Sequence, residues 1–463
     1  MTLSELEKKS ILILGFGTEG QATYDFLRNR WPAKTLSIAD QRNMDEYPEE
    51  LVRRIEHDPA IRLNFGSRYL DSLDPYSCEV IIKTPGIPAS TEAIARARHS
   101  GCKLTSHSQI FLDNYPNDRV IGVTGTKGKS TTASLIHHIL KQAGLPAELV
   151  GNIGQPPLVL IDSVPERTFF VHEFSSHQLA EIETSPHIAV LLNIVPEHLD
   201  YYASFDAYVA AKENITRFQT AEDFLVLNDD YPVPATIAAR TPAQLRAISM
   251  EHPASGCYAR NNTILRGVIQ GEEEVMAVDE IPLKGRFNVQ NVLAAIAAAS
   301  LCDVPAAVLR DAIRSFNALP HRLERAGTYK GITFYDDSIA TVPEATLAAL
   351  EALGSDVQTL ILGGHERNLD FKGLGANLPP SIRTVILFPP TGERIWKAIE
   401  SLSQNPLPAA FFVSQMEEAV KIAYDRTTPG SICLLSPASP SFGTFKNYKE
   451  RGDSFKAFVR KLS

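Results

Sequence analysis

Short apolar runs alternate with longer amphipathic stretches along most of this chain. Three such runs in the first 110 residues, at 11–14, 36–39 and 80–82, predict parallel strands. Strands are also predicted at 120–123, 169–171, 188–192, 332–335, 359–362, 385–388 and 432–435. Because helical patterns lie between these runs, we expect an α/β fold built on parallel sheets.

The same pattern predicts three domains, at residues 1–110, 111–318 and 319–463. Near the end of the second segment, a β-rich patch at about 255–280 is predicted to be a small excursion from the sheet. Alanine-rich helices are expected at 288–300 and 304–316, and residues 319–322 are expected to form a hinge.

Composition narrows the class of protein. The 463 residues are 44% hydrophobic and 21% charged, as in globular proteins, with a net charge of −9 that argues against a general nucleic-acid or anionic-membrane surface. The five cysteines are scattered and lack CxxC spacing, which favours a reducing cytoplasm. A polar N-terminus and the lack of a long apolar run predict no signal segment and no membrane insertion.

Residues 119–144 carry the strongest functional signal. An apolar strand leads into a turn containing Gly125, Gly128 and Lys129, and a helix follows until Gly144. Such a turn cradles phosphate with its backbone N–H groups, while Lys129 reaches the terminal phosphates and Ser130 or Thr131 holds Mg²⁺. The usual Gly-x4-Gly-Lys spacing is not met, because position 123 is valine, so an ordinary glycine turn is the alternative.

A second glycine turn follows the first predicted strand. Residues 15–20 read Gly-Phe-Gly-Thr-Glu-Gly, and Asp40 closes the next strand 20 residues after Gly20. This is a dinucleotide fingerprint, but the same turn can hold any nucleotide diphosphate. The Pro-Gly loop at 83–88 ends the third strand, at the edge where ligands of open α/β sheets bind.

Polar residues after later strands offer further chemistry. Glu173 and His198 follow predicted strands and could face Mg²⁺ near the phosphate turn, although isolated residues at strand ends are commonly structural. Taken alone, Lys212 is expected to be a solvent-exposed lysine on a helix. Asn288 and Asn291 share one helix face and could read an adenine edge or cap the helix.

Two polar segments begin the third predicted domain. His321-Arg322 and Asp336-Asp337-Ser338 could close on ATP, since arginine offers a planar fork to phosphate. Surface ion pairs are the alternative for both segments.

Read together, these segments resemble the Mur ligase family, and nearly the whole chain takes part in the resemblance. Within the family, the chain is most similar to the branch that adds glutamate. Ten matching motifs occur in order, at 125–132, 151–154, 173–179, 193–200, 210–212, 288 with 291, 319–324, 336–341, 362–364 and 434–452. The resemblance implies an N-terminal Rossmann-like UDP-binding domain, a central P-loop ATPase-like domain and a C-terminal Rossmann-like domain that contacts glutamate and ATP.

The resemblance also implies roles for single residues. It implies that catalysis involves Lys129, Glu173, His198 and Lys212, and that Lys212 is carbamylated beside Mg²⁺. The metals are held by Ser130, Thr131, Glu173, His198 and Lys212. ATP is bound by Gly125, Thr126, Lys127, Gly128, Lys129, Ser130, Thr131, Asn288, Asn291, Arg322 and Asp337. The nucleotide substrate is bound by Gly15, Gly17, Asp40, Gln41, Arg42, Asn152 and Ser175.

The activity implied is an ATP-dependent ligation. Glutamate, by default the D enantiomer, is joined to UDP-N-acetylmuramoyl-L-alanine through an acyl phosphate, with release of ADP and phosphate. This reaction belongs to peptidoglycan precursor synthesis, and so to cell-wall biogenesis, cell shape, cell division and the cell cycle. The resemblance further implies a magnesium-dependent, cytoplasmic monomer.

The chain departs from the family pattern where glutamate should bind. Ile339 stands where a lysine is usual and Gly443 where an aspartate is expected. The glutamate contacts expected from the remaining residues are Thr341, Arg367, Ser441 and Tyr448. These departures leave an L-glutamate-adding variant as the alternative.

Three other functions remain open. Folylpolyglutamate synthase uses the same chemistry on another acceptor. An NAD-dependent oxidoreductase would use residues 15–20 and Asp40, but would leave Lys129 and Glu173 without a role. A non-catalytic nucleotide sensor would bind ATP without releasing phosphate.

Overall fold

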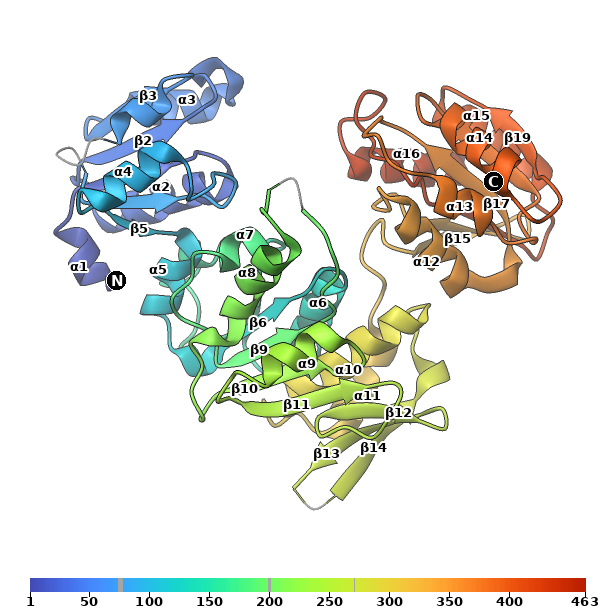
Figure 1. The fold of residues 1–463 in the computed structure, drawn as a ribbon, viewed down its shortest axis with the longest axis horizontal. Coiled ribbons are helices and arrows are strands. Elements are labelled where there is room, and N and C mark those ends of the chain that lie inside the picture. The colour runs from blue at the N-terminus through green and yellow to red at the C-terminus, as the bar shows by residue number, and fades with distance from the viewer. Residues whose placement is uncertain (74–77, 199–200, 270) are drawn as a thin grey trace. The chain divides into compact units, whose positions relative to one another are not determined.

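The computed structural model describes residues 1–73, 78–198, 201–269 and 271–463. Leu199 and Asp200, part of one predicted motif, lie outside the described residues. The chain forms two compact units: Met1–Glu280 with Gln290–Ile313, and Ile281–Val289 with Arg314–Ser463. The first unit contains two β-sheets and the second contains one, so the fold is α/β as predicted (Figure 1).

The first sheet has five parallel strands in the order β3-β2-β1-β4-β5. The strands are β1 (Ile11–Leu14), β2 (Leu36–Asp40), β3 (Ile61–Phe65), β4 (Val80–Lys83) and β5 (Lys103–Thr105). The helices between and after them are α2 (Thr18–Arg30), α3 (Glu49–Glu56), α4 (Glu92–His99) and α5 (His107–Asn114). The predicted strands β1, β2 and β4 are confirmed. The edge strands β3 and β5 were not predicted, because charged and polar residues interrupt them.

The second sheet has nine strands in the order β14-β13-β12-β11-β10-β9-β6-β8-β7. Its parallel part is β6 (Val120–Thr124), β7 (Ala147–Gly151), β8 (Phe169–Glu173), β9 (Ile188–Leu191), β10 (Phe224–Asn228) and β11 (Gln244–Ser249). The helices that matter for the site are α6 (Lys129–Gln142), α7 (Ser176–Leu179), α8 (Phe205–Arg217) and α10 (Arg286–Ser300). Central strands β6, β8 and β9 are fully buried, which is why their apolar runs were recognisable.

The β-rich patch at 255–280 does not leave the sheet, and that prediction is wrong. It forms β12 (Cys257–Arg260), β13 (Thr263–Val268) and β14 (Gly271–Ala277). Strand β12 pairs with β11 through Ile248 and Cys257, and the antiparallel hairpins then extend the same sheet. Pairing with β11 satisfies backbone groups that a separate excursion would leave at an open edge.

The sheet of the second unit has the order β15-β16-β20-β17-β18-β19. Its strands are β15 (Glu324–Tyr329), β16 (Ile332–Asp336), β17 (Val357–Gly363), β18 (Thr384–Phe388), β19 (Ala409–Phe412) and β20 (Ile432–Leu435). The helices are α12 (Pro343–Leu353), α13 (Lys372–Ala376), α14 (Gly392–Leu402), α15 (Met416–Arg426) and α16 (Tyr448–Lys461). Since β16, β20 and β17 are adjacent and parallel, the loops that follow them leave the same edge.

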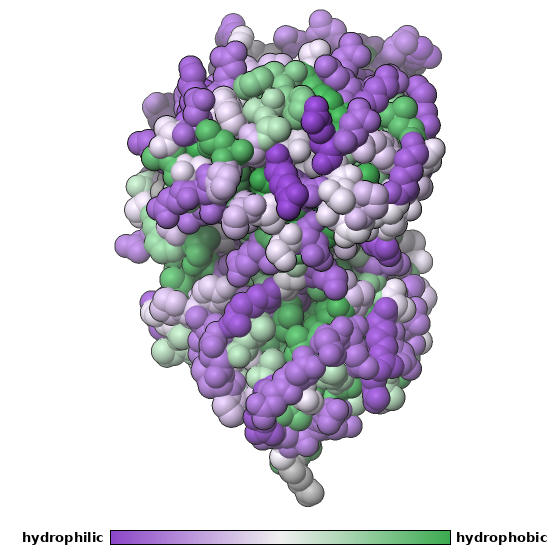
Figure 2. Space-filling view, turned by 90° about the vertical axis from the view of Figure 1, so that its right-hand side faces the viewer, coloured by the Kyte–Doolittle hydropathy of each residue, from purple (hydrophilic) through white to green (hydrophobic). Residues whose placement is uncertain are grey.

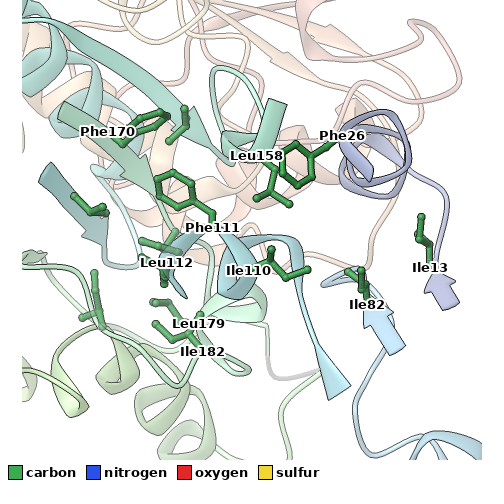
Figure 3. Close-up of a cluster of buried hydrophobic side chains, with 14 of the residues drawn as sticks. Ile13, Phe26, Ile82, Ile110, Phe111, Leu112, Leu158, Phe170, Leu179 and Ile182 are labelled. Atoms are coloured by element: carbon green, nitrogen blue, oxygen red, sulfur yellow. The ribbon is translucent and has the colours of Figure 1, made fainter. Parts of the chain in front are cut away.

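One hydrophobic cluster joins the two sheets of the first unit. Phe111 of α5 packs against Phe170 of β8, with ring centroids 4.9 Å apart. The neighbouring Ile110 points toward Ile82 of β4, in the other sheet (Figure 3). Leu158 and Phe26 meet in the same cluster (Figure 3). This continuous core fixes the nucleotide turn of the first sheet relative to the phosphate turn of the second.

The surface and the helix lengths complete the description. On the face drawn in Figure 2, hydrophilic side chains predominate and separate the apolar areas. No helix in the described parts of the chain has both the length and the apolar composition that crossing a bilayer requires.

Candidate active site

The turn between β6 and α6 requires its two glycines. Gly125 has φ 154° and Gly128 has φ 88°, in the region that side-chain-bearing residues rarely adopt. A Cβ on Gly128 would lie 2.3 Å from Oδ1 of Asn291, and one on Gly125 would lie 2.7 Å from Cβ of Leu192. Gly128 caps α6 without a side-chain hydrogen bond. The helix N-terminus is therefore left open for an anion.

Lys129 folds back over this turn. Its Nζ donates to the carbonyl oxygens of Gly125 at 3.1 Å and Thr126 at 2.9 Å. Thr126 is tied to the loop after β9, since its N–H donates to the carbonyl oxygen of Asn193 at 2.7 Å. The turn is thus fixed in shape, and the ammonium group lies beside it. Lys127 is exposed, and its Nζ pairs with Glu197 at 2.6 Å.

Glu173 ends β8, next to β6, and is almost fully buried. Its Oε1 accepts a hydrogen bond from Nδ2 of Asn152 at 3.0 Å. Its Oε2 is buried and has no hydrogen-bond partner among the described residues. A buried carboxylate oxygen left without a partner is costly, and a divalent cation would satisfy it.

Lys212 on α8 is buried rather than solvated, so the alternative of an exposed helix lysine is wrong. Its Nζ donates to the carbonyl oxygen of Gly125 at 2.8 Å and to Oγ1 of Thr124 at 3.3 Å. Burial, reinforced by the charge of Lys129, holds the pKa of Lys212 well below its usual range.

Aromatic side chains form the opposite wall. His198 has φ 55°, and its ring lies 5.2 Å from that of His177 and 6.3 Å from that of Tyr208. The Tyr208 hydroxyl is 3.1 Å from Oγ1 of Thr126, on the phosphate turn. This wall therefore joins His198 to the turn through Tyr208.

Several of these side chains line one pocket of about 400 Å³ in the first unit; Glu173 is not in its lining and is linked to it through Asn152. Of the predicted residues, it brings together Lys129, Asn152, Ser175, His198 and Lys212. Ser175 caps α7, accepting from the N–H of Gln178 at 3.2 Å. Sequence reasoning did not single out Glu19, Pro85, Gly86, Ser176, His177, Gln178, Tyr201 and Tyr208, which complete the lining. Only Tyr201 lay outside the segments already recognised, since Tyr208 begins the segment that contains Lys212.

The turn after β1 borders a second pocket, also about 400 Å³, in the same unit. Its lining includes the predicted Gly15, Asp40, Gln41 and Arg42, together with Glu46, Tyr69, Thr84 and Ile87. Gly17 is not in this lining and instead caps α2. The Asp40 carboxylate accepts from the N–H groups of Phe16 at 2.5 Å and Arg42 at 2.8 Å. Although burial opposes it, these hydrogen bonds hold the pKa of Asp40 below its usual range.

The two amides of α10 are both buried and differ in their contacts. Oδ1 of Asn291 accepts from Oγ1 of Thr132 at 3.2 Å, bracing α6. Nδ2 of Asn288 donates to the carbonyl oxygen of Lys284 at 2.7 Å, before the helix begins. This contact is not an N-cap, because a cap accepts from backbone N–H groups, whereas Asn288 donates to a carbonyl oxygen.

In the second unit, the loops after β16 and β20 are tied together. Asp337 accepts from Oγ of Ser436 at 2.9 Å and from the N–H of Leu323 at 3.1 Å. Burial raises the pKa of Asp337 to about 7. His321 and Asp336 are buried and 2.8 Å apart, so the alternative of a surface ion pair is wrong for them.

Among the described residues, the single group of three with metal-ligand spacing is His321, Glu324 and Asp336. Lys456 already pairs with both of its carboxylates, with Nζ 2.8 Å from Glu324 and 3.8 Å from Asp336. We therefore interpret this group as an ion-pair network.

Arg451 of α16 connects the loops that follow β16 and β20. Its guanidinium donates to Oγ of Ser338 at 3.0 Å, to the carbonyl oxygen of Ser338 at 2.8 Å and to that of Ser439 at 3.0 Å. Oγ of Ser338 in turn donates to the carbonyl oxygen of Tyr448 at 2.8 Å. Of the predicted glutamate contacts, Ser441 is buried, Thr341 and Tyr448 are half-buried and Arg367 is exposed.

Comparisons with known proteins identify the family of the chain. Residues 123–299 match the Mur ligase middle domain, and residues 321–439 match the Mur ligase glutamate ligase domain. The UDP-N-acetylmuramoylalanine–D-glutamate ligase of Acidobacterium capsulatum is 35% identical over 459 residues, covering 98% of this chain and 97% of that protein. The ligase of the same name from Symbiobacterium thermophilum is 34% identical, covering 97% and 98%.

Solved structures share the fold. The UDP-N-acetylmuramate-alanine ligase MurC of Thermotoga maritima aligns with a TM-score of 0.58 at 18% identity, over 98% of this chain and 100% of that chain. The MurF ligase of the same organism, in complex with ADP, aligns with a TM-score of 0.58 at 17% identity, over 98% and 95%. With full-length relatives above 30% identity and two matching domains, this chain belongs to the Mur ligase family and is an ATP-dependent ligase.

Proposed function

We propose that this enzyme joins D-glutamate to UDP-N-acetylmuramoyl-L-alanine, using ATP and releasing ADP and phosphate. The relatives named above carry this activity in their names over the full chain. The observation that carries the proposal is the pocket that Lys129, at the open N-terminus of α6, lines together with Lys212 and Asn152, the last of which donates to Glu173. It combines a phosphate cradle with an unsatisfied carboxylate, as phosphoryl transfer requires.

The chemistry has two steps. The alanyl carboxylate of the substrate attacks the γ-phosphorus of ATP, giving an acyl phosphate and ADP. The amine of glutamate then attacks the acyl carbon, and the tetrahedral intermediate expels phosphate. Lys129 and the N–H groups at the start of α6 hold and neutralise the phosphates, while the rigid turn fixes their position.

The donor set fits Mg²⁺, which would supply further charge neutralisation when bound. Glu173 would hold it through its unpartnered Oε2, with His198 and Ser130 or Thr131 as additional ligands. Lys212 is buried against the turn, where an uncharged amine can add to CO₂ to form a carbamate with loss of a proton. Carbamylation would replace a buried cation with an anionic ligand beside the metal.

The pocket after β1 would hold the UDP moiety. Gly15 lies at the turn, and Arg42 stands over the ring of Tyr47 at 4.2 Å, offering a cation at the pocket rim. On this assignment, residues 1–110 form the UDP-substrate-binding domain, 111–318 the central ATP-binding domain and 319–463 the C-terminal domain that contacts glutamate and ATP. Arg322, Asp337, Asn288 and Asn291 stay predicted ATP contacts.

Glutamate would bind at the edge of the third sheet. Ser441 and Tyr448 belong to the loop and helix that follow β20, and Arg367 follows β17, so adjacent parallel strands carry them. Thr341 follows β16 on the neighbouring strand. One cation and three hydroxyls are suitable partners for two carboxylates. The reaction is placed in the cytoplasm, where ATP is available and thiols stay reduced; a monomer stays a prediction.

Acceptor-dependent release of ADP tests this function. ATP and D-glutamate should give ADP only when UDP-N-acetylmuramoyl-L-alanine is present. Replacing that acceptor with a folate tests the folylpolyglutamate alternative, and NADH binding tests the oxidoreductase. Binding of ATP without release of ADP under any of these conditions would make the protein a nucleotide sensor and overturn the proposal.

A further inference from the structure

Glu19 is a half-buried acid that the mechanism above does not use. It lies in the first turn of α2, within the glycine turn of residues 15–20. Its Oε1 accepts a hydrogen bond from Nε2 of Gln178 at 2.5 Å. Its Oε2 is buried and has no hydrogen-bond partner in the described parts of the chain. An unsatisfied buried carboxylate oxygen calls for a donor from outside the protein.

Glu19 belongs to a segment that borders both pockets. Gly15 and Thr84 line the pocket proposed for UDP, whereas Glu19 and Gly86 line the pocket beside the phosphate turn. Two short segments, one after β1 and one after β4, therefore contribute to both pockets. A substrate with its nucleotide in the first pocket and its reacting carboxylate in the second would extend along these two segments, one of which carries Glu19.

The missing partner of Glu19 Oε2 is not a metal ion. Glu19 belongs to no group of metal-ligand spacing among the described residues, where the single such group lies around His321 in the second unit. An N–H or O–H group is the remaining partner of a carboxylate oxygen. The segment of the proposed substrate between diphosphate and alanyl carboxylate is an acylated amino sugar, which carries both hydroxyl and amide donors.

We propose that Glu19 is a substrate-binding residue that recognises this acylated amino-sugar segment, accepting a hydrogen bond at Oε2 while Gln178 holds Oε1. The inference rests on the proposed function. It makes Glu19 the residue that distinguishes the whole substrate from its nucleotide part. UDP alone does not extend past the boundary and does not use this contact.

The test measures the affinities of UDP and of UDP-N-acetylmuramoyl-L-alanine by calorimetry for three proteins. Glu19→Ala should weaken binding of the whole substrate by about tenfold to a hundredfold, as loss of a hydrogen bond to a charged group does, with UDP affinity unchanged. Arg42→Ala, in the UDP pocket, should weaken binding of both ligands alike. Equal loss of both ligands in Glu19→Ala, or loss of neither, overturns the inference.

Glu19→Gln decides the matter even where the alanine variant does not fold. Glutamine keeps the side-chain volume but is a weaker acceptor, so the whole substrate should bind roughly threefold to tenfold less tightly, and UDP should bind normally. Wild-type affinity for the whole substrate in this variant contradicts the inference. If the wild-type protein itself binds no UDP-N-acetylmuramoyl-L-alanine, the proposed function fails instead.

Discussion

The side-chain nitrogen of Lys212 lies 2.8 Å from the carbonyl oxygen of Gly125, directly beneath the phosphate turn. The same turn receives Nζ of Lys129, 3.1 Å from the same oxygen. Two lysines thus converge on one backbone carbonyl, and one of them is almost fully buried. This arrangement favours an uncharged Lys212. The two lysines can therefore be tested separately, Lys212 by rescue with an added anion and Lys129 by the loss of a cation.

Lys212→Ala should lose nearly all ligase activity, and short carboxylic acids should restore part of it. The reason is that a small anion can replace the carbamate in the space the side chain leaves. Steady-state release of ADP with and without added acetate or formate measures this. Arg217→Ala, at the exposed end of the same helix, is the control and should stay active. Full activity of wild-type protein after removal of CO₂ would argue against the carbamate.

Lys129→Ala should reduce kcat by on the order of 10²–10³, because one charge that stabilises phosphoryl transfer is lost. Circular dichroism should show an unchanged fold, since the side chain is only half-buried. Lys141→Ala, in the exposed last turn of the same helix, should leave kcat unaltered. A folded Lys129→Ala protein with near-normal kcat would rule out the phosphate cradle.

Arg367→Ala should raise KM for glutamate by about tenfold while KM for ATP changes little, because the variant removes a cation that pairs with a carboxylate. The matched control is Arg383→Ala. Arg383 is equally exposed but precedes β18 and so stands at the opposite edge of the same sheet. If both variants raise KM for glutamate alike, the effect is one of general charge and the binding site lies elsewhere.

The enantiomer of glutamate is the most direct check on the site at the third sheet. We expect turnover with D-glutamate and little with L-glutamate at equal concentration. Both enantiomers carry the same groups, so selectivity comes from where Arg367, Ser441 and Thr341 hold the two carboxylates. Phosphate release with L-glutamate alone would overturn this choice, and release with neither would remove glutamate as the substrate.

Stability should fall as the pH drops below about 6.5, and buried His172 is one cause. Burial lowers the pKa of His172 to about 3, and neither ring nitrogen has a hydrogen-bond partner among the described residues. The unfolded chain therefore binds a proton at higher pH than the folded one, so stability is lost on acidification. At pH 5 the loss attributable to His172 is about 2 kcal/mol.

The variant His172→Leu should shrink the difference in Tm between pH 7 and pH 5, because leucine cannot take up the proton. His57→Gln, an exposed residue at the end of α3, should leave that difference as it is. His107, also buried with its pKa lowered to about 3, should keep part of the acid sensitivity in the His172 variant. An unchanged difference in the His172→Leu protein would show that this histidine does not contribute.

The sequence by itself determined the α/β class, the buried strands β1, β6, β8 and β9, and the phosphate turn. Buried parallel strands are continuous apolar runs, and a glycine turn before a helix is a local signal. The same local logic could not find β3 or β7, which are only partly buried and whose apolar runs are interrupted by Arg62 and Asn64 in β3 and by Glu148 in β7. It also placed β12 to β14 outside the sheet, because the sequence pattern predicted no strand at β11, with which β12 pairs.

Only the tertiary structure decided which polar residues meet. Lys212 resembles a solvated lysine in sequence, yet packing of α8 against β6 buries it beside Gly125. Glu19 lies within a glycine motif and was not singled out, but the core shared by the two sheets brings it to Gln178. Burial and hydrogen-bond satisfaction are properties of contacts made across the chain, so no local pattern encodes them.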